Sequence, residues 1–299
     1  MSLISDPTSH ISHLKWRSIL KLTGFALILT LLSLIVITAE ASRRIVANLI
    51  IWDCPVPSRT PAEVGLANYQ VVQIQPQSKQ TLTGWYVPSQ NGAAILLLQG
   101  HWTARDGMLP EAEILARHGY GVMLLDPHPC AGSSVVHTMG QAEVEDVAKA
   151  IQFMQQQPDI VDGKIGMLGF SIGGVIAIES AARLQEIRAV VAEGNFHDLI
   201  TNITPRSADN TLVGGLVQWL IIFFYRSYTG LNPALVKPID SVAKISPAPS
   251  CLLPARAKPK PIRPWPNLQP LVSPKNSGWC WGWDMVAMVT AGRKLMSNN

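Results

Sequence analysis

Gly169-Phe170-Ser171-Ile172-Gly173 is the segment of this sequence best suited to covalent chemistry. An apolar run precedes it and a helical pattern follows it, which predicts a sharp strand-to-helix turn that exposes the serine hydroxyl. Glycines two residues before and after the serine leave the room that such a turn needs. The following N–H, that of Ile172, would then point toward the oxyanion of a tetrahedral acyl intermediate. The pattern predicts Ser171 as a nucleophile, and the structural alternative is a glycine-rich turn with an N-capping serine.

A serine nucleophile also needs a histidine base that is oriented by a carboxylate. His197 and Asp198 are weak substitutes for this pair, because neighbouring side chains on one loop seldom give a base directed at the serine with an acid behind it. The catalytic acid and base therefore stay unassigned. No histidine follows His197 in the chain, whose seven are His10, His13, His101, His118, His128, His137 and His197.

Cofactors and metals are not expected from the sequence. The four cysteines, Cys54, Cys130, Cys251 and Cys280, show neither Cys-x-x-Cys spacing nor a histidine spacing suited to zinc.

Strand and helix patterns alternate around the serine. Helical patterns at 109–118, 144–154 and 173–184 separate apolar or alternating segments. This order predicts an α/β fold with a mostly parallel sheet that is covered by helices on both faces. The expected strands are 69–75, 81–87, 93–99, 120–126, 164–170 and 189–194.

The chain resembles the α/β-hydrolase superfamily over about residues 69–249, in particular its membrane-anchored, serine-peptidase-like and esterase-like members. The resemblance rests on the order of several segments and implies a family loop at Asp126-Pro127-His128-Pro129-Cys130-Ala131-Gly132-Ser133, where the family's arginine is missing. It also implies that the N–H of His101, after Gln99-Gly100, completes the oxyanion hole. The segments are GWYVP (84–88), LLLQGHWTARDGM (96–108), LARHGYGVMLLDPHPCAGSS (115–134), EDVAKAIQFM (145–154), IGMLGFSIGG (165–174) and IRAVVAEG (187–194).

Residues 22–39 form an uncharged apolar run long enough to cross a bilayer. We predict a retained single-pass anchor with the catalytic domain on the outer side; the alternative is secretion after cleavage near Ala41. The predicted organisation is a stub and anchor over 1–42, a connector over 43–67, an incomplete hydrolase domain over 68–250 and a Pro- and Trp-rich tail over 251–299. A second apolar stretch, 212–228, is expected to be a cap or buried helix more than a second span.

The tail does not resemble the close of an α/β-hydrolase domain. Prolines crowd into 247–274 and acids nearly vanish. When the codons of 275–286 are read one base out of frame, they permit a strand that ends in Gly-His-Gly, which resembles the family's last strand and catalytic histidine. We therefore expect a frameshift between about 248 and 275, with the last strands lost, the strand at 189–194 left as an open edge, and a marginally stable domain. The alternative is a proline-rich disordered extension.

The distribution of charge limits the classes of partner that the protein is expected to bind. Seven of the 24 Lys and Arg residues lie in 251–299 with one of the 20 acids, so the first 250 residues carry 17 basic and 19 acidic groups, which argues against nucleic acid. The expected partners are a small ester or peptide-like substrate and the bilayer. The predicted function is hydrolysis of ester or amide bonds, impaired in this chain by loss of the catalytic histidine; the alternative is a non-catalytic, membrane-tethered binding protein.

Overall fold

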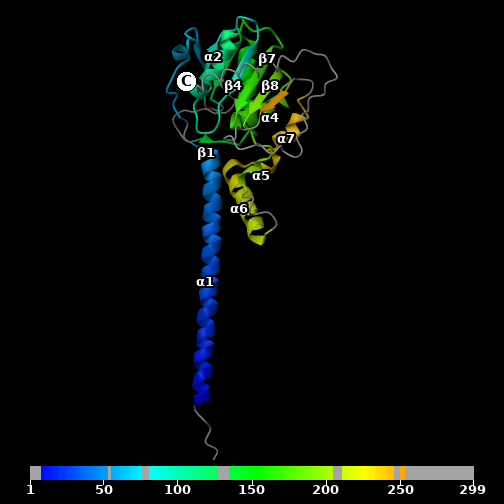
Figure 1. Ribbon diagram of the computed structural model, residues 1–299. Coiled ribbons are helices and arrows are strands. Elements are labelled where there is room, and N and C mark those ends of the chain that lie inside the picture. Colours follow the sequence, from blue (N-terminus) through cyan, green and yellow to red (C-terminus); the bar gives the residue numbers. More distant parts are fainter. Residues whose placement is uncertain are drawn as a thin grey trace, which may run out of the picture.

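A long N-terminal helix and an α/β domain make up the computed structural model, which describes residues 8–52, 55–75, 81–126, 135–204, 211–245 and 250–253. Helix α1 (Thr8–Ile50) is a single helix that extends away from the domain as a stem (Figure 1). Within the described residues, Ser18–Ile50 is the one helical stretch long and apolar enough to cross a membrane. Its apolar side chains are exposed, as expected of a helix that lies in lipid or of a signal segment that is removed.

The domain is built on a seven-stranded sheet of order β2-β3-β5-β4-β7-β8-β9. Strands β5, β4, β7, β8 and β9 run parallel to one another, whereas the pairs β2–β3 and β3–β5 are antiparallel. The predicted mostly parallel sheet is therefore confirmed. The strands are β2 (Gln70–Ile74), β3 (Leu82–Val87), β4 (Ala94–Leu98), β5 (Gly121–Leu125), β7 (Ile165–Phe170), β8 (Ile187–Glu193) and β9 (Ser250–Leu253).

Both faces of the sheet are buried, which explains why its central strands are continuous apolar runs. Along β4, Ile95 and Leu97 join the core that α2 (Leu109–Arg117) covers, and Leu96 and Leu98 join the core under α3 (Glu143–Gln155) and α4 (Ile172–Ala181). Each such side chain removes its whole surface from water, a contribution of about 1.5–3 kcal/mol. The sheet is thus held rigidly between two helical layers, and this fixes where its strands end.

The remaining elements are short, apart from α6. They are β1 (Ile51–Trp52), η1 (Pro61–Val64), η2 (Arg105–Met108), β6 (Val135–Val136), α5 (Leu199–Ile203), α6 (Leu212–Thr229), η4 (Pro233–Leu235) and α7 (Pro238–Val242).

The stem continues beyond its predicted end. Helix α1 runs through Ile50, although 43–67 was predicted as a connector. Arg43 and Arg44 pair with Glu40 one turn earlier, at 2.7 Å each, and Val46 and Ile50 are fully buried against the domain. Local ion pairs and tertiary packing therefore extend the helix, because packing of an amphipathic helix end against the domain stabilises it more than helix propensity alone does.

The expected loss of every strand after residue 250 is wrong in one respect. Strand β9 lies parallel to β8, with Val190 opposite Ser250 and Glu193 opposite Leu253, so the edge of β8 is covered. An unpaired edge strand leaves its N–H and C=O groups unsatisfied, and a short apolar segment that follows α7 satisfies them. The predicted boundary between domain and tail falls inside this strand, and residues 254–299 lie outside the described residues.

The stretch predicted as a cap or buried helix is neither fully buried nor separate from the stem. Leu220, Ile221 and Tyr225 of α6 are buried, whereas Leu212 and Trp219 are 97% and 59% exposed. Tyr225 donates a hydrogen bond of 2.8 Å from its hydroxyl to the carbonyl of Thr138. One side of α6 thus attaches to the domain, and the other side is apolar and uncovered.

Candidate active site

Ser171 occupies a strained turn between β7 and α4. Its φ of 54° and ψ of −116° lie in a region that side-chain-bearing residues rarely adopt. Gly169 and Gly173 make the turn possible, because a Cβ on Gly169 would lie 2.6 Å from the Gly174 nitrogen and one on Gly173 would lie 2.6 Å from the Gln99 oxygen. The two glycines of the motif are therefore required by close backbone approach on both sides of the serine.

The turn does not use the serine hydroxyl to cap the helix. Ser171 precedes α4 at the N-cap position, and its side chain makes no capping hydrogen bond. The backbone holds the turn instead: the Ser171 N–H donates to the Glu193 carbonyl at 2.7 Å, and the Ser171 carbonyl accepts from Gly174 at 3.0 Å. These contacts disfavour the reading of Ser171 as a capping residue and leave its half-buried hydroxyl at the carboxyl edge of the sheet.

The end of β4 lies against this turn. A Cβ on Gly100 would lie 3.2 Å from Cβ of Ser171 and 2.9 Å from the Phe170 ring, so glycine lets β4 approach the turn without displacing that ring. The next backbone N–H is that of His101. Ile172 is the first residue of α4, and the N–H groups of a first helical turn have no intrahelical acceptor. The end of β4 and the first turn of α4 therefore meet at Ser171.

Aromatic rings hold the His101 side chain. Its ring stacks on Trp102 at 4.2 Å and 22°, and it lies 4.2 Å from the ring of Trp52 at the domain end of the stem. Burial lowers the pKa of His101 to about 4, because a charged imidazolium would lose its hydration there. Within the described residues, Nε2 of His101 is buried and has no hydrogen-bond partner. Trp102 itself has a positive φ of 58°, so the chain turns sharply at this point.

A buried ion pair braces the same edge of the sheet. Asp126 directly follows β5 and pairs with Arg105 of η2, while the Gln99 amide donates to Asp126 at 3.3 Å. Burial raises the pKa of Asp126, and the Arg105 guanidinium opposes that shift. Arg105 also lies over the Trp85 ring at 4.4 Å. Arg105 thus supplies a charge next to the loop in which the family's own arginine is missing, and no local motif marked it.

The comparisons with known proteins agree with this geometry. The profile of the family described as X-Pro dipeptidyl-peptidase (S15 family) matches residues 58–224, which is 167 of the 299 residues. The chain belongs to the X-Pro dipeptidyl-peptidase S15 family. This is a family of serine hydrolases with the α/β-hydrolase fold, so the resemblance seen in the sequence is confirmed.

Two curated relatives of this S15 family member come from fungi. It is 28% identical over 111 residues to the thiohydrolase aneE of Aspergillus aculeatus, covering 36% of the chain and 35% of that relative. It is 26% identical over 146 residues to the polyketide transferase ATR5 of Stachybotrys chlorohalonatus, covering 47% of the chain and 49% of that relative. The chain thus spans about a third to a half of these relatives' lengths.

A solved structure shows the same fold. The crystal structure of an alpha-beta hydrolase from Vibrio vulnificus matches with a TM-score of 0.50 and 16% identity. The match covers 68% of this chain and 70% of the Vibrio vulnificus chain.

The two substitute residues for the S15 acid and base lie on the loop after β8. Asp198 is the N-cap of α5, where its carboxylate accepts from the Thr201 N–H at 2.8 Å, and Nζ of Lys237 is 4.0 Å away. His197 is exposed, and its carbonyl accepts from Ile239. The structure therefore gives Asp198 a helix-capping bond at the start of α5.

Two further histidines have local partners. His118 contacts the Ile114 carbonyl through Nδ1 at 2.8 Å, and His137 is buried with its ring 3.9 Å from Trp52 and its Nδ1 3.9 Å from Glu143. The family loop that contains His128 lies outside the described residues. Among the described residues, no group of three or more His, Cys, Asp or Glu side chains is placed to hold a metal ion.

Proposed function

We propose that this S15 family member is a membrane-anchored serine hydrolase that transfers acyl groups from esters or amides to water, with Ser171 as the nucleophile. The observation that carries the proposal is the backbone of Ser171, which is held in a strained conformation while its side chain makes no capping bond. Strain of this kind persists where the surrounding structure enforces it, and it is concentrated at functional sites. The acyl chemistry named for the fungal relatives is of the same class.

The proposed reaction uses the two N–H groups beside the nucleophile. Oγ of Ser171 attacks the substrate carbonyl, its proton passes to a base, and the carbonyl oxygen becomes an oxyanion that accepts hydrogen bonds from Ile172 and His101. Collapse of the intermediate expels the alcohol or amine with a proton, and water then releases the acid from the serine ester. One oxyanion donor is worth about 2.7–4 kcal/mol of barrier, so the position of the β4 end decides much of the rate.

Turnover by this chain is proposed to be low, because the histidine expected last in the family's chain order has no counterpart after His197. Loss of the triad costs on the order of a million-fold in a well-studied serine protease. The frameshift proposal explains the missing residue. The nucleotide sequence across codons 245–290 tests it: one insertion or deletion should restore a late acid and a terminal histidine. If none does, the chain is a degenerate hydrolase.

The anchor rather than a cleaved signal is favoured by the end of the stem. Cleavage near Ala41 would fall inside the continuous helix α1, next to Ser42, which is 2% exposed, and ahead of the buried Val46 and Ile50. We propose that residues 22–39 span the bilayer with the domain on the outer side. Carbonate extraction and the mass of the mature chain test this: a chain that starts after Ala41 and washes off membranes would refute the anchor.

A fluorophosphonate probe tests the nucleophile on the full chain. Because the base is missing, we expect slow labelling of the wild-type protein, loss of the label in Ser171→Ala, and the same slow labelling in Ser227→Ala, which changes an exposed serine on α6. Labelling that survives Ser171→Ala removes Ser171 from its role. A wild-type protein that is folded but unlabelled is instead the non-catalytic tethered binding protein. In parallel, hydrolysis of a p-nitrophenyl ester at ordinary enzyme rates, abolished by Ser171→Ala, would show that a base is present.

A further inference from the structure

Helix α6 carries an uncovered apolar stripe. Leu212, Leu216, Trp219 and Phe223 are spaced by four, three and four residues, which places them on one side of a helix. They are 97%, 38%, 59% and 48% exposed. An exposed patch of several large apolar side chains is typical of a binding surface rather than of an ordinary soluble surface.

The stripe belongs to a helix that packs against the stem. Helices α1 and α6 pack against one another, and a guanidinium nitrogen of Arg43 donates to the Tyr228 hydroxyl at 3.2 Å. Figure 1 shows α6 running from the domain along the domain-proximal part of the stem. From Leu212 to Tyr225 the helix has no charged residue. These thirteen steps extend about 20 Å at 1.5 Å per residue, which is comparable with the depth of one bilayer leaflet.

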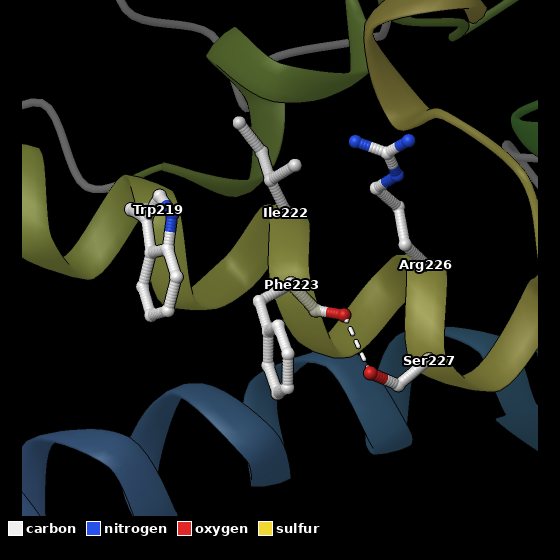
Figure 2. Close-up of a pocket in the computed structure, with 5 residues that line it drawn as sticks. All are labelled: Trp219, Ile222, Phe223, Arg226 and Ser227. Atoms are coloured by element: carbon white, nitrogen blue, oxygen red, sulfur yellow. Dashed lines mark hydrogen bonds between the residues drawn. The ribbon is translucent and has the colours of Figure 1, made fainter.

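Residues of the stripe also line a hollow of about 360 Å³ on α6, formed by Trp219, Ile222, Phe223, Arg226 and Ser227. Figure 2 shows these five side chains projecting from α6, with Arg226 further along the helix than the two aromatic rings. The two rings stack at 5.5 Å and 15°. Arg226 is the first charged residue of α6, and it lies half a turn from Tyr228, the residue that Arg43 contacts. Arginines of both helices therefore lie at one level, where the apolar surface ends.

We infer that the α6 stripe is embedded in the acyl chains of the leaflet from which α1 emerges, with Arg226 and Arg43 at the level of the lipid headgroups. The inference rests on the proposed anchoring by α1. Arg206 and Asp209 precede α6 in the sequence, and charged side chains avoid the centre of a bilayer, so the insertion is shallow and oblique rather than a second span. Because Trp52 at the end of the stem contacts the His101 ring, this arrangement sets the catalytic edge of the sheet at the membrane surface.

Site-specific photo-crosslinking in vesicles tests the inference on the full chain. A diazirine amino acid is placed singly at Leu216, in vesicles of phosphatidylcholine and phosphatidylglycerol whose acyl chains carry an alkyne tag. Three positions serve as references. Leu29 reports on the anchor, Val217 is a half-buried neighbour that faces the core side of the same helix, and Val161 is 50% exposed on the domain.

We expect lipid adducts when the diazirine is at Leu216 or Leu29, and no adduct when it is at Val217 or Val161. Adducts at Leu29 without any at Leu216 would overturn the inference and leave the anchor intact. Crosslinks from Leu216 to a second copy of the chain would also overturn it, because the stripe would then be a dimer interface. Absence of adducts at Leu29 would refute the anchor, and an adduct at Leu216 would still establish lipid contact by α6.

Discussion

Adding one methyl group at Gly173 should separate the two halves of the candidate site. A Cβ there would lie 2.6 Å from the Gln99 carbonyl oxygen and closer still to the Leu98 carbonyl oxygen, whereas ordinary contact begins at 3.4 Å. The end of β4 would have to move by more than about 0.8 Å, and neither neighbour is a flexible side-chain tip. Overpacking of a rigid core costs about 1–3 kcal/mol, and we expect the upper end because backbone must shift.

The same chemical change at Gly215 is the matched control. Nothing lies within 4 Å of a Cβ built at Gly215, which is in helix α6. Alanine there should stabilise the protein by about 0.5–1 kcal/mol, because glycine loses more backbone freedom in a helix. The two variants therefore differ by about 3–4 kcal/mol in the free energy of unfolding with opposite signs, although each adds one methyl group.

Thermal and urea unfolding of the detergent-solubilised chain, followed by tryptophan fluorescence, measures the difference. For a domain of this size about 3 kcal/mol lowers the Tm by roughly 6–12 °C. Gly173→Ala should also lose fluorophosphonate labelling in the fraction that stays folded, because the His101 N–H moves with β4. A Gly173→Ala protein with wild-type Tm and labelling would refute the reasoning that backbone contact between β4 and α4 sets the site.

Three further predictions concern the surroundings of the site. Arg105→Met should lower the unfolding free energy by about 3–5 kcal/mol, since it leaves the Asp126 carboxylate buried without its cation; adding Asp126→Leu should recover most of this in urea titrations, and a double variant no better than the single one would contradict the pairing. Acidification should destabilise the protein between pH 6.5 and about 4, because in that range the unfolded chain binds a proton at His101 that the folded chain does not. The loss is about 1–2 kcal/mol after allowance for partial exposure, and a His101→Phe variant with the same pH slope would assign it elsewhere. Tyr225→Phe removes the 2.8 Å bond to Thr138 and should cost about 1 kcal/mol in the same titration, whereas an unchanged midpoint would show that packing alone holds α6.

Parts of the fold followed from the sequence because they depend on local patterns. The predicted strands at 93–99, 120–126 and 164–170 have apolar interiors with a polar residue only at an end, and such runs become strands that are buried on both faces. The turn at Ser171 is similarly local: two glycines around the serine, between an apolar run and a helical pattern, mark a turn that excludes side chains. The structure adds the φ of Ser171 and the atoms that each glycine would meet, which depend on how β4 packs against α4.

Other features were decided by contacts between distant segments, and no local pattern reports them. Arg105 became the partner of Asp126 because the chain after β4 folds over the end of β5. The stem reached Ile50 because Val46 and Ile50 found a buried surface on the domain, and β9 formed because β8 offered an open edge. The apolar stretch 212–228 predicted a cap or buried helix, but its burial on one side and exposure on the other were set by its packing against the domain and α1. Sequence thus determined the elements and the nucleophilic turn, while the pairing of charges, the covering of edges and the exposure of α6 were decided by tertiary structure, because each depends on which surfaces meet in space.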